Sequence, residues 1–223
     1  MIHNSKNKGK LIVIEGSDGS GKTTQSKLLL DYLKSKKIPS AYISFPRYKE
    51  SLWADMITRY LLGDFGKIDG LDPYVVSLMF AGDRLSAAPQ IRKWLSEGKV
   101  VICNRYVPSN IGHMAAKMSQ SQRGKYIDWL EKLEYQENGI PREDLVILLQ
   151  VDPKISRELM KKRTPDIHET NLKYQEKVYA VYNYVAGIKK NWVKVDCAVD
   201  GKLLNPAQIH QKVVDGLRKR VFV

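Results

Sequence analysis

A glycine-rich segment from Gly16 to Thr23 places the strongest constraint on how this chain folds. Its sequence, Gly-Ser-Asp-Gly-Ser-Gly-Lys-Thr, fits the pattern GxxxxGK[ST] and lies between an apolar strand at 10–15 and an amphipathic helix at about 21–36. The glycines allow a loop whose backbone N–H groups all point toward a bound anion. A loop of this kind at the start of a helix predicts a nucleotide-binding site.

The side chains of this loop predict how ATP and its metal ion are held. Lys22 is placed to reach the β- and γ-phosphates, and the Thr23 hydroxyl is placed to join the Mg²⁺ shell. The predicted ATP-binding residues are Gly16, Ser17, Asp18, Gly19, Ser20, Gly21, Lys22, Thr23 and Thr24. Because ATPases, GTPases and kinases share such loops, the motif does not name the reaction.

Strand-like and helix-like segments alternate along the whole chain. The expected strands are 10–15, 41–45, 100–104, 145–151 and 192–196. The expected helices are 21–36, 72–94, 108–119, 123–138, 153–162, 168–189 and 206–220. The strands at 100–104 and 145–151 are apolar with little alternation, which is typical of strands covered on both faces. We therefore predict a single α/β domain over residues 1–223, with a five-stranded parallel sheet between two layers of helices.

The bulk properties limit the partners and the compartment. A net charge of +13 indicates anionic partners, either nucleotides or nucleic acid. No apolar run approaches the roughly 20 residues of a membrane-spanning helix. Residues 1–9 lack the apolar core of a signal peptide and read as a flexible basic arm, so we expect a cytoplasmic protein. Cys103 and Cys197 have no metal-type spacing and are expected to be buried thiols.

Arginine and aromatic side chains follow the ends of the predicted strands, where sheets of this type bind ligands. Arg47 and Tyr48 follow the second strand and Arg105 follows the third, and these side chains are suited to hold a phosphate group. The alternative is a surface loop in which Phe45 only completes the core. Asp18 adds a carboxylate for a sugar hydroxyl or, alternatively, for a contact within its own turn.

Two pairs of side chains stand one helical turn apart and share a face, Phe80 with Arg84 and Ser109 with His113. A ring and a guanidinium on one face can stack on a base and bind its edge. The alternative is a core phenylalanine beneath a solvated arginine. A lone histidine is more often a structural hydrogen-bonding group than a catalyst.

A compact basic segment follows the helix predicted at 153–162. Its cations are Lys161, Lys162 and Arg163, with Pro165 two residues further on. The segment is either a solvated helix end or a lid at about 160–168 that closes over the transferring phosphoryl group.

As a set, these segments resemble the thymidylate kinase family over nearly the whole chain. The resemblance rests on motifs in the family's order, at 15–25, 45–47, 80–84, 105–110 and 166–169. It implies a P-loop kinase fold with a short basic lid, and transfer of a phosphoryl group from ATP to dTMP with Mg²⁺. It also implies a cis peptide bond before Pro46 and a homodimer packed through helices.

The resemblance also implies roles for individual residues on the nucleoside side. Asp18 is expected to bind the 3′-hydroxyl of dTMP, Phe80 to stack on thymine, and Arg84 and Asn110 to contact the polar edge of the base. The full expected substrate-binding set is Asp18, Phe45, Arg47, Tyr48, Phe80, Arg84, Arg105, Ser109, Asn110 and His113.

The same resemblance places Arg47, Tyr48 and Arg105 around the phosphate of dTMP. Since Gly19 and Ser20 supply no cation inside the loop, the lid must supply it. The residues expected to carry catalysis are Lys22, Arg105, Arg163 and Asp18.

Two positions depart from the family pattern. Asn104 stands where an aspartate is common beside the metal and phosphates, which changes the charge around Mg²⁺. Met114 replaces a polar residue often found after the position of His113. Three alternatives stay open. One is a kinase for another monophosphate such as dUMP. The two more distant ones are a nucleic-acid-stimulated P-loop ATPase and an inactive binding protein that keeps the fold, to which only Asn104 points. We do not expect nucleic acid as a partner.

Overall fold

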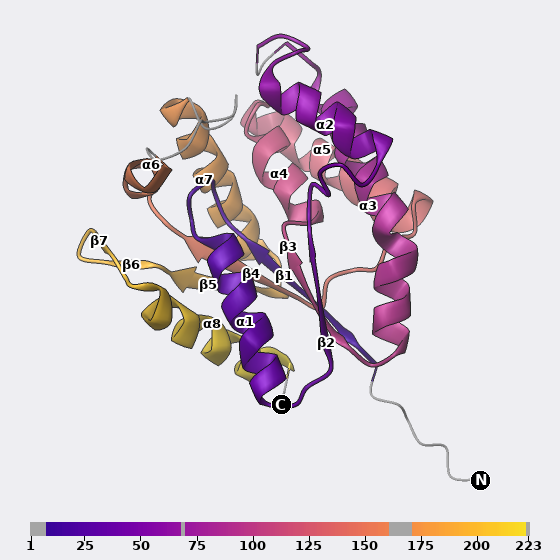
Figure 1. The fold of residues 1–223 in the computed structure, drawn as a ribbon. Coiled ribbons are helices and arrows are strands. Elements are labelled where there is room, and N and C mark those ends of the chain that lie inside the picture. Colours follow the sequence, from indigo (N-terminus) through magenta and orange to yellow (C-terminus); the bar gives the residue numbers. More distant parts are fainter. Residues whose placement is uncertain (1–7, 68–69, 161–170, 222–223) are drawn as a thin grey trace.

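Five parallel strands form the central sheet of the computed structural model, which describes residues 8–67, 70–160 and 171–221. The strand order is β2-β3-β1-β4-β5 (Figure 1). The strands are β1 (Lys10–Glu15), β2 (Ser40–Ser44), β3 (Val100–Asn104), β4 (Leu145–Gln150) and β5 (Trp192–Asp196). The predicted α/β class and parallel sheet are confirmed, and each expected strand lies within one residue of its observed bounds.

Helices cover both faces of this sheet. They are α1 (Lys22–Ser35), α2 (Leu52–Leu62), α3 (Pro73–Ser96), α4 (Val107–Ala115), α5 (Gln120–Glu131), α6 (Pro153–Met160), α7 (Leu172–Ile188) and α8 (Pro206–Val221). Successive side chains of a strand point to opposite faces. Leu11 and Val13 therefore pack with α3, α4, α5 and α7, whereas Ile12 and Ile14 pack with α1 and α8.

Local sequence signals explain where the long helix α3 begins. The Asp72 side chain accepts a hydrogen bond from the Tyr74 backbone N–H at 2.8 Å, and Pro73 occupies the first turn. An aspartate at this position satisfies a backbone donor that the helix leaves open, and proline loses nothing there. The predicted start at Asp72-Pro73 is confirmed.

Three local elements were not predicted. Helix α2 buries Ile57 and Tyr60 but leaves the apolar side chains of Leu52 and Met56 exposed, so the apolar residues in its sequence are not confined to the buried face. The segment Lys132–Glu137 continues α5 as a π-helix, where a regular helix was expected. A short hairpin, β6 (Ala198–Val199) and β7 (Lys202–Leu203), follows β5.

Two predicted segments, the basic arm and the lid, fall largely outside the residues that the structure describes. The basic arm was expected to extend to Gly9, but Gly9 is buried and its backbone N–H donates to the Leu95 carbonyl at 3.1 Å. The folded domain therefore begins by that residue. The lid residues Lys161, Lys162 and Arg163 lie outside the described residues. Among the residues that are described, no helix has the length and apolar character needed to cross a bilayer.

The approach of α7 to α4 depends on a residue without a side chain. A Cβ atom at Gly112 would lie 2.5 Å from the ring of Tyr182. By contrast, a Cβ atom at Gly124, on α5, would meet no atom within 4 Å.

We therefore expect Gly112→Ala to lower the free energy of unfolding by about 1–3 kcal/mol, because the Tyr182 ring must move. The matched control Gly124→Ala should raise it by about 0.5–1 kcal/mol, because alanine favours a helix interior. Urea unfolding of both variants gives these values, and equal effects of the two substitutions would contradict the packing argument.

Candidate active site

The loop after β1 has the shape of an anion cradle. Gly16 has φ 150°, and a Cβ atom there would lie 2.7 Å from the Leu149 carbonyl oxygen. Gly21, with φ 86°, precedes α1. The Lys22 ammonium donates to the carbonyl oxygens of Gly16 at 2.9 Å and Ser17 at 2.8 Å. The loop thus holds a cation beside the N-terminus of a helix, where an anion is stabilised.

Polar atoms of the loop are left without internal partners. The side-chain hydroxyls of Ser17 and Ser20 are buried and have no hydrogen-bond partner among the described residues. Buried hydroxyls are normally paired, because an unpaired one carries a desolvation cost. Phosphate oxygens would supply acceptors at this position.

A pair of oxygen atoms beside the loop suits a hard metal ion. The Asn104 amide nitrogen, at the end of β3, donates to Thr23 Oγ1 at 3.2 Å and to Ser44 Oγ at 3.2 Å. The side-chain amide oxygen of Asn104, Oδ1, is buried and has no partner among the described residues. Mg²⁺ prefers oxygen ligands and commonly keeps water in its shell. The residues present therefore fit Mg²⁺, with one neutral amide where a carboxylate would add charge.

A cavity lies next to the loop and has about 530 Å³ of unfilled space, part of it open to solvent. It is lined by residues of the P-loop, the segment after β2, and helices α2, α3 and α4. They are Asp18, Phe45, Pro46, Tyr48, Leu61, Phe80, Arg84, Arg105, Tyr106, Ser109, Asn110, His113 and Met114. Every predicted substrate-binding residue except Arg47 lines it.

An ion pair joins the loop to this cavity. The Arg105 guanidinium contacts the Asp18 carboxylate, and the other Asp18 oxygen accepts a hydrogen bond from Gln175 Nε2 at 3.0 Å. Arg105 has φ 66°, a left-handed conformation unusual for a residue with a side chain. Such strain is found where the surrounding structure requires a particular side-chain direction. Here it brings Arg105 to the border between loop and cavity.

His113 lies in the same cavity and is uncharged at neutral pH. Its Nε2 is 3.3 Å from Arg105 Nη1, and its Nδ1 is 3.3 Å from the Tyr174 hydroxyl. Burial, with a smaller contribution from the neighbouring Arg105 cation, lowers the pKa of His113 to about 3. The imidazole therefore shapes and hydrogen-bonds within the pocket and does not exchange a proton near pH 7.

Arg47 is the one predicted substrate residue that does not line the cavity. Its Nε donates to Asp83 Oδ1 at 3.1 Å, and its backbone N–H donates to Asp83 Oδ2 at 2.9 Å. Glu50 lies 3.5 Å from the same guanidinium. Arg47 thus fastens the segment after β2 to α3, and its contact with a phosphate stays a prediction. The peptide bond before Pro46 is cis, as predicted.

Aromatic and apolar side chains line the part of the cavity that also contains Arg84 and Asn110. Phe80 meets Tyr60 edge-on, with ring centroids 6.4 Å apart, and Met114 lies nearby in the lining. Arg84 is buried and paired with Glu134, and Asn110 Nδ2 donates to the Ser77 carbonyl at 3.3 Å. A flat apolar ligand with a polar edge suits this part of the pocket.

Two residues that hold this site together were not identified as such from the sequence. Glu15 is buried at the end of β1 and accepts hydrogen bonds from the Tyr106 backbone N–H, the Ser109 hydroxyl and the Tyr182 hydroxyl, each at 2.9 Å. A carboxylate ending a buried strand was the available signal, because such a group requires partners. For Gln175, on α7, nothing in the sequence indicated that its side chain would contact Asp18.

Comparison with known proteins identifies the family. A family model described as thymidylate kinase matches residues 14–205. The chain belongs to the thymidylate kinase family. A thymidylate kinase from Mycobacterium tuberculosis is 32% identical over 199 residues, covering 85% of this chain and 92% of the relative. One from Caldicellulosiruptor saccharolyticus is 30% identical over 216 residues, covering 96% and 99%.

Solved structures agree with this membership. A thymidylate kinase from Candida albicans superposes with a TM-score of 0.72 at 25% identity, covering 95% of this chain and 92% of that one. The predicted resemblance and the predicted P-loop kinase fold are thereby confirmed. A chain of this family is a kinase that transfers a phosphoryl group from ATP to dTMP, as expected from the motifs.

Proposed function

We propose that this chain converts dTMP to dTDP by direct in-line transfer of the γ-phosphoryl group of ATP, with Mg²⁺. The observation that supports the proposal is the Asp18–Arg105 ion pair, which joins a residue of the anion loop to the lining of the adjoining cavity. Nucleotides bound in the loop and in the cavity would have their phosphates adjacent. Catalysis then comes from positioning and from neutralising charge.

On the ATP side, the backbone of 16–24 holds the phosphates and Lys22 supplies a charge beside the β- and γ-phosphates. Thr23 and Asn104 would hold Mg²⁺, since the Thr23 hydroxyl and the unpartnered Oδ1 of Asn104 are the oxygen atoms available beside the loop. Bound Mg²⁺ would neutralise negative charge on the phosphates and orient them. The proposal also includes the lid cations Lys161, Lys162 and Arg163. Of these three, Arg163 is the one expected to carry catalysis.

On the acceptor side, Arg105 and Tyr48 bind the phosphate of dTMP, and Arg47 contributes from outside the cavity lining. Asp18 binds the 3′-hydroxyl through the oxygen that Gln175 now contacts. Ser109 and neutral His113 flank the sugar. No general base is required, because phosphoryl transfer of this type relies mainly on electrostatics.

The base lies in the part of the cavity where Phe80 stacks on it and Arg84 and Asn110 contact its polar edge. Met114, Phe45 and Leu61 line this region with apolar surface that suits the 5-methyl group of thymine. A methyl group in an apolar pocket is worth only about 1–3 kcal/mol, so dUMP is the second candidate acceptor. The thymidylate kinase from Candida albicans is itself described as having a broad substrate specificity.

We also propose that two copies associate through an apolar face formed by α2 and α3. Leu52 on α2 and Val75, Leu78 and Leu85 on α3 are exposed. The ring of Trp53 lies directly over Gly82, so the two helices present one continuous surface. Exposed apolar side chains gathered on one face mark an association site. A second copy, presenting the same face, is the partner this surface fits.

Leu78→Asp should convert the dimer to a monomer at micromolar concentration, because each interface would bury two carboxylates. Sedimentation velocity measures the change. Ile188→Asp, at another exposed apolar position on α7, is the control and should remain dimeric. A monomeric parent protein, or a dimeric Leu78→Asp variant, would contradict the proposed face.

The acceptor is tested by measuring ADP release from Mg-ATP with a panel of ribo- and deoxynucleoside monophosphates. Release should require an acceptor, and kcat/KM for dTMP should exceed that for dUMP by about 10- to 200-fold, as expected for one methyl group. A preferred acceptor other than dTMP would overturn the substrate. Acceptor-independent hydrolysis that rises with added DNA or RNA would favour the ATPase.

A further inference from the structure

The π-helical segment Lys132–Glu137 directs one carboxylate into the interior beside the base end of the cavity. Glu134 lies in this segment and is fully buried. An extra residue in a helical turn rotates the following side chains by about 100° relative to a regular helix. Such bulges are rare and occur frequently at functional sites. The irregular turn therefore aims Glu134 at α3.

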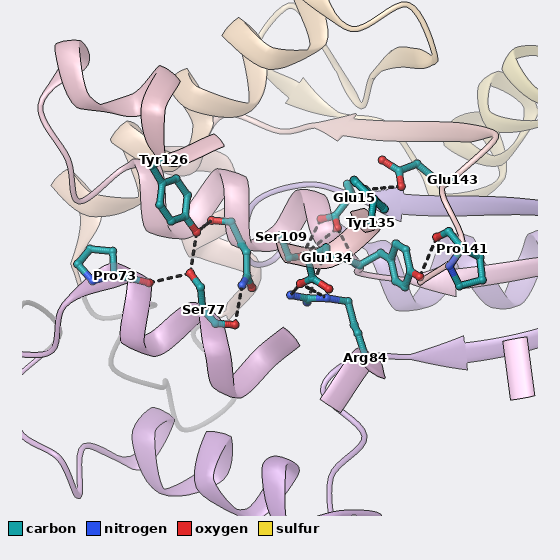
Figure 2. Close-up of polar contacts among 12 residues, drawn as sticks. Glu15, Pro73, Ser77, Arg84, Ser109, Tyr126, Glu134, Tyr135, Pro141 and Glu143 are labelled. Atoms are coloured by element: carbon teal, nitrogen blue, oxygen red, sulfur yellow. Dashed lines mark hydrogen bonds and ion pairs between the residues drawn. The ribbon is translucent and has the colours of Figure 1, made fainter. Parts of the chain in front are cut away.

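Glu134 binds one edge of the Arg84 guanidinium through a single carboxylate oxygen. Arg84 Nε donates to Glu134 Oε1 at 2.9 Å, and Arg84 Nη2 contacts the same oxygen (Figure 2). Among the described residues, Arg84 Nη1 makes one hydrogen bond, a long one of 3.4 Å to the Tyr106 carbonyl. Since Arg84 also lines the cavity, its Nη1 edge is the one left for a ligand.

The pair carries no net charge and is almost completely shielded from solvent. The exposed fractions of the side chains of Arg84 and Glu134 are 1% and 0%. Without Glu134, Arg84 would be an uncompensated buried cation, which strongly attracts an anion. With Glu134 present, the Arg84 part of the cavity carries no net charge, and Arg105 is likewise paired with Asp18. The adjoining loop, by contrast, carries the Lys22 ammonium, which contacts only uncharged carbonyl oxygens in the hydrogen bonds named above.

We propose that Glu134 is a positioning residue that fixes Arg84 for the base edge and masks its charge, so that the acceptor's phosphate binds only at the loop end. This inference rests on the proposed function. Its consequence is specific: the neutral pair offers one N–H edge to a carbonyl oxygen of a pyrimidine but no net charge to a phosphate.

Glu134→Gln keeps the shape of the side chain and an oxygen acceptor but removes the charge. KM for dTMP should rise about tenfold, the size of one charge-assisted hydrogen bond, while kcat changes much less. Inorganic sulfate should compete with dTMP at least about threefold more strongly, because the unmasked guanidinium attracts anions. A purely structural role for Glu134 would not strengthen sulfate inhibition.

Glu143→Gln is the matched control. Glu143 follows the π-helical segment, and its carboxylate accepts a hydrogen bond at 2.7 Å from the hydroxyl of Tyr135, which lies within that segment. Figure 2 shows Glu143 apart from Arg84. We expect both KM for dTMP and sulfate inhibition to stay at the parent values in this variant.

Glu134→Asp separates the two roles and serves if Glu134→Gln does not fold. It keeps the charge but shortens the reach, so KM should rise while sulfate inhibition stays unchanged. Parent values of both quantities in folded Glu134→Gln, or of KM in Glu134→Asp, would overturn the proposal. A parent protein that does not phosphorylate dTMP at all would instead overturn the proposed function.

Discussion

Parallel pairing of β1 with β3 is the constraint from which the active site follows. The register sets Ile14 opposite Asn104, and the Arg105 backbone N–H donates to the Ile14 carbonyl at 3.1 Å. The anion loop leaves one strand and Arg105 leaves the next, at the same edge of the sheet. The Asp18–Arg105 ion pair then forms across the two strand ends. The proposed donor and acceptor sites adjoin each other because these strands are neighbours.

Charge is distributed unevenly along the acceptor cavity. Arg105 is paired with Asp18, His113 is neutral through burial, and the Arg84 cation is compensated by Glu134, while the adjoining loop carries the Lys22 ammonium. A nucleotide has the same asymmetry, with a doubly charged phosphate at one end and an uncharged base at the other. The charges around the pocket would therefore orient a nucleotide with its phosphate toward the loop, independently of which base it carries.

The sequence allowed the sheet and the loop to be predicted because both depend on local signals. Apolar runs mark buried strands, and GxxxxGK[ST] between a strand and a helix specifies its own geometry. The partners of Arg47 and Arg84 could not be predicted, because Asp83 and Glu134 are brought to them by tertiary packing. In the case of Glu134, a π-helical turn that no sequence pattern announced decides the direction of the side chain.

The most direct test of this account is the binding of dTMP and of thymidine to Arg105→Ala, measured by titration calorimetry without ATP. The account predicts that affinity for dTMP falls by at least about tenfold, the worth of one charge-assisted phosphate contact. Affinity for thymidine, which has no phosphate, should stay within about twofold of the parent protein. An equal loss for both ligands, or no loss for either, would contradict the assignment of Arg105 to the acceptor phosphate.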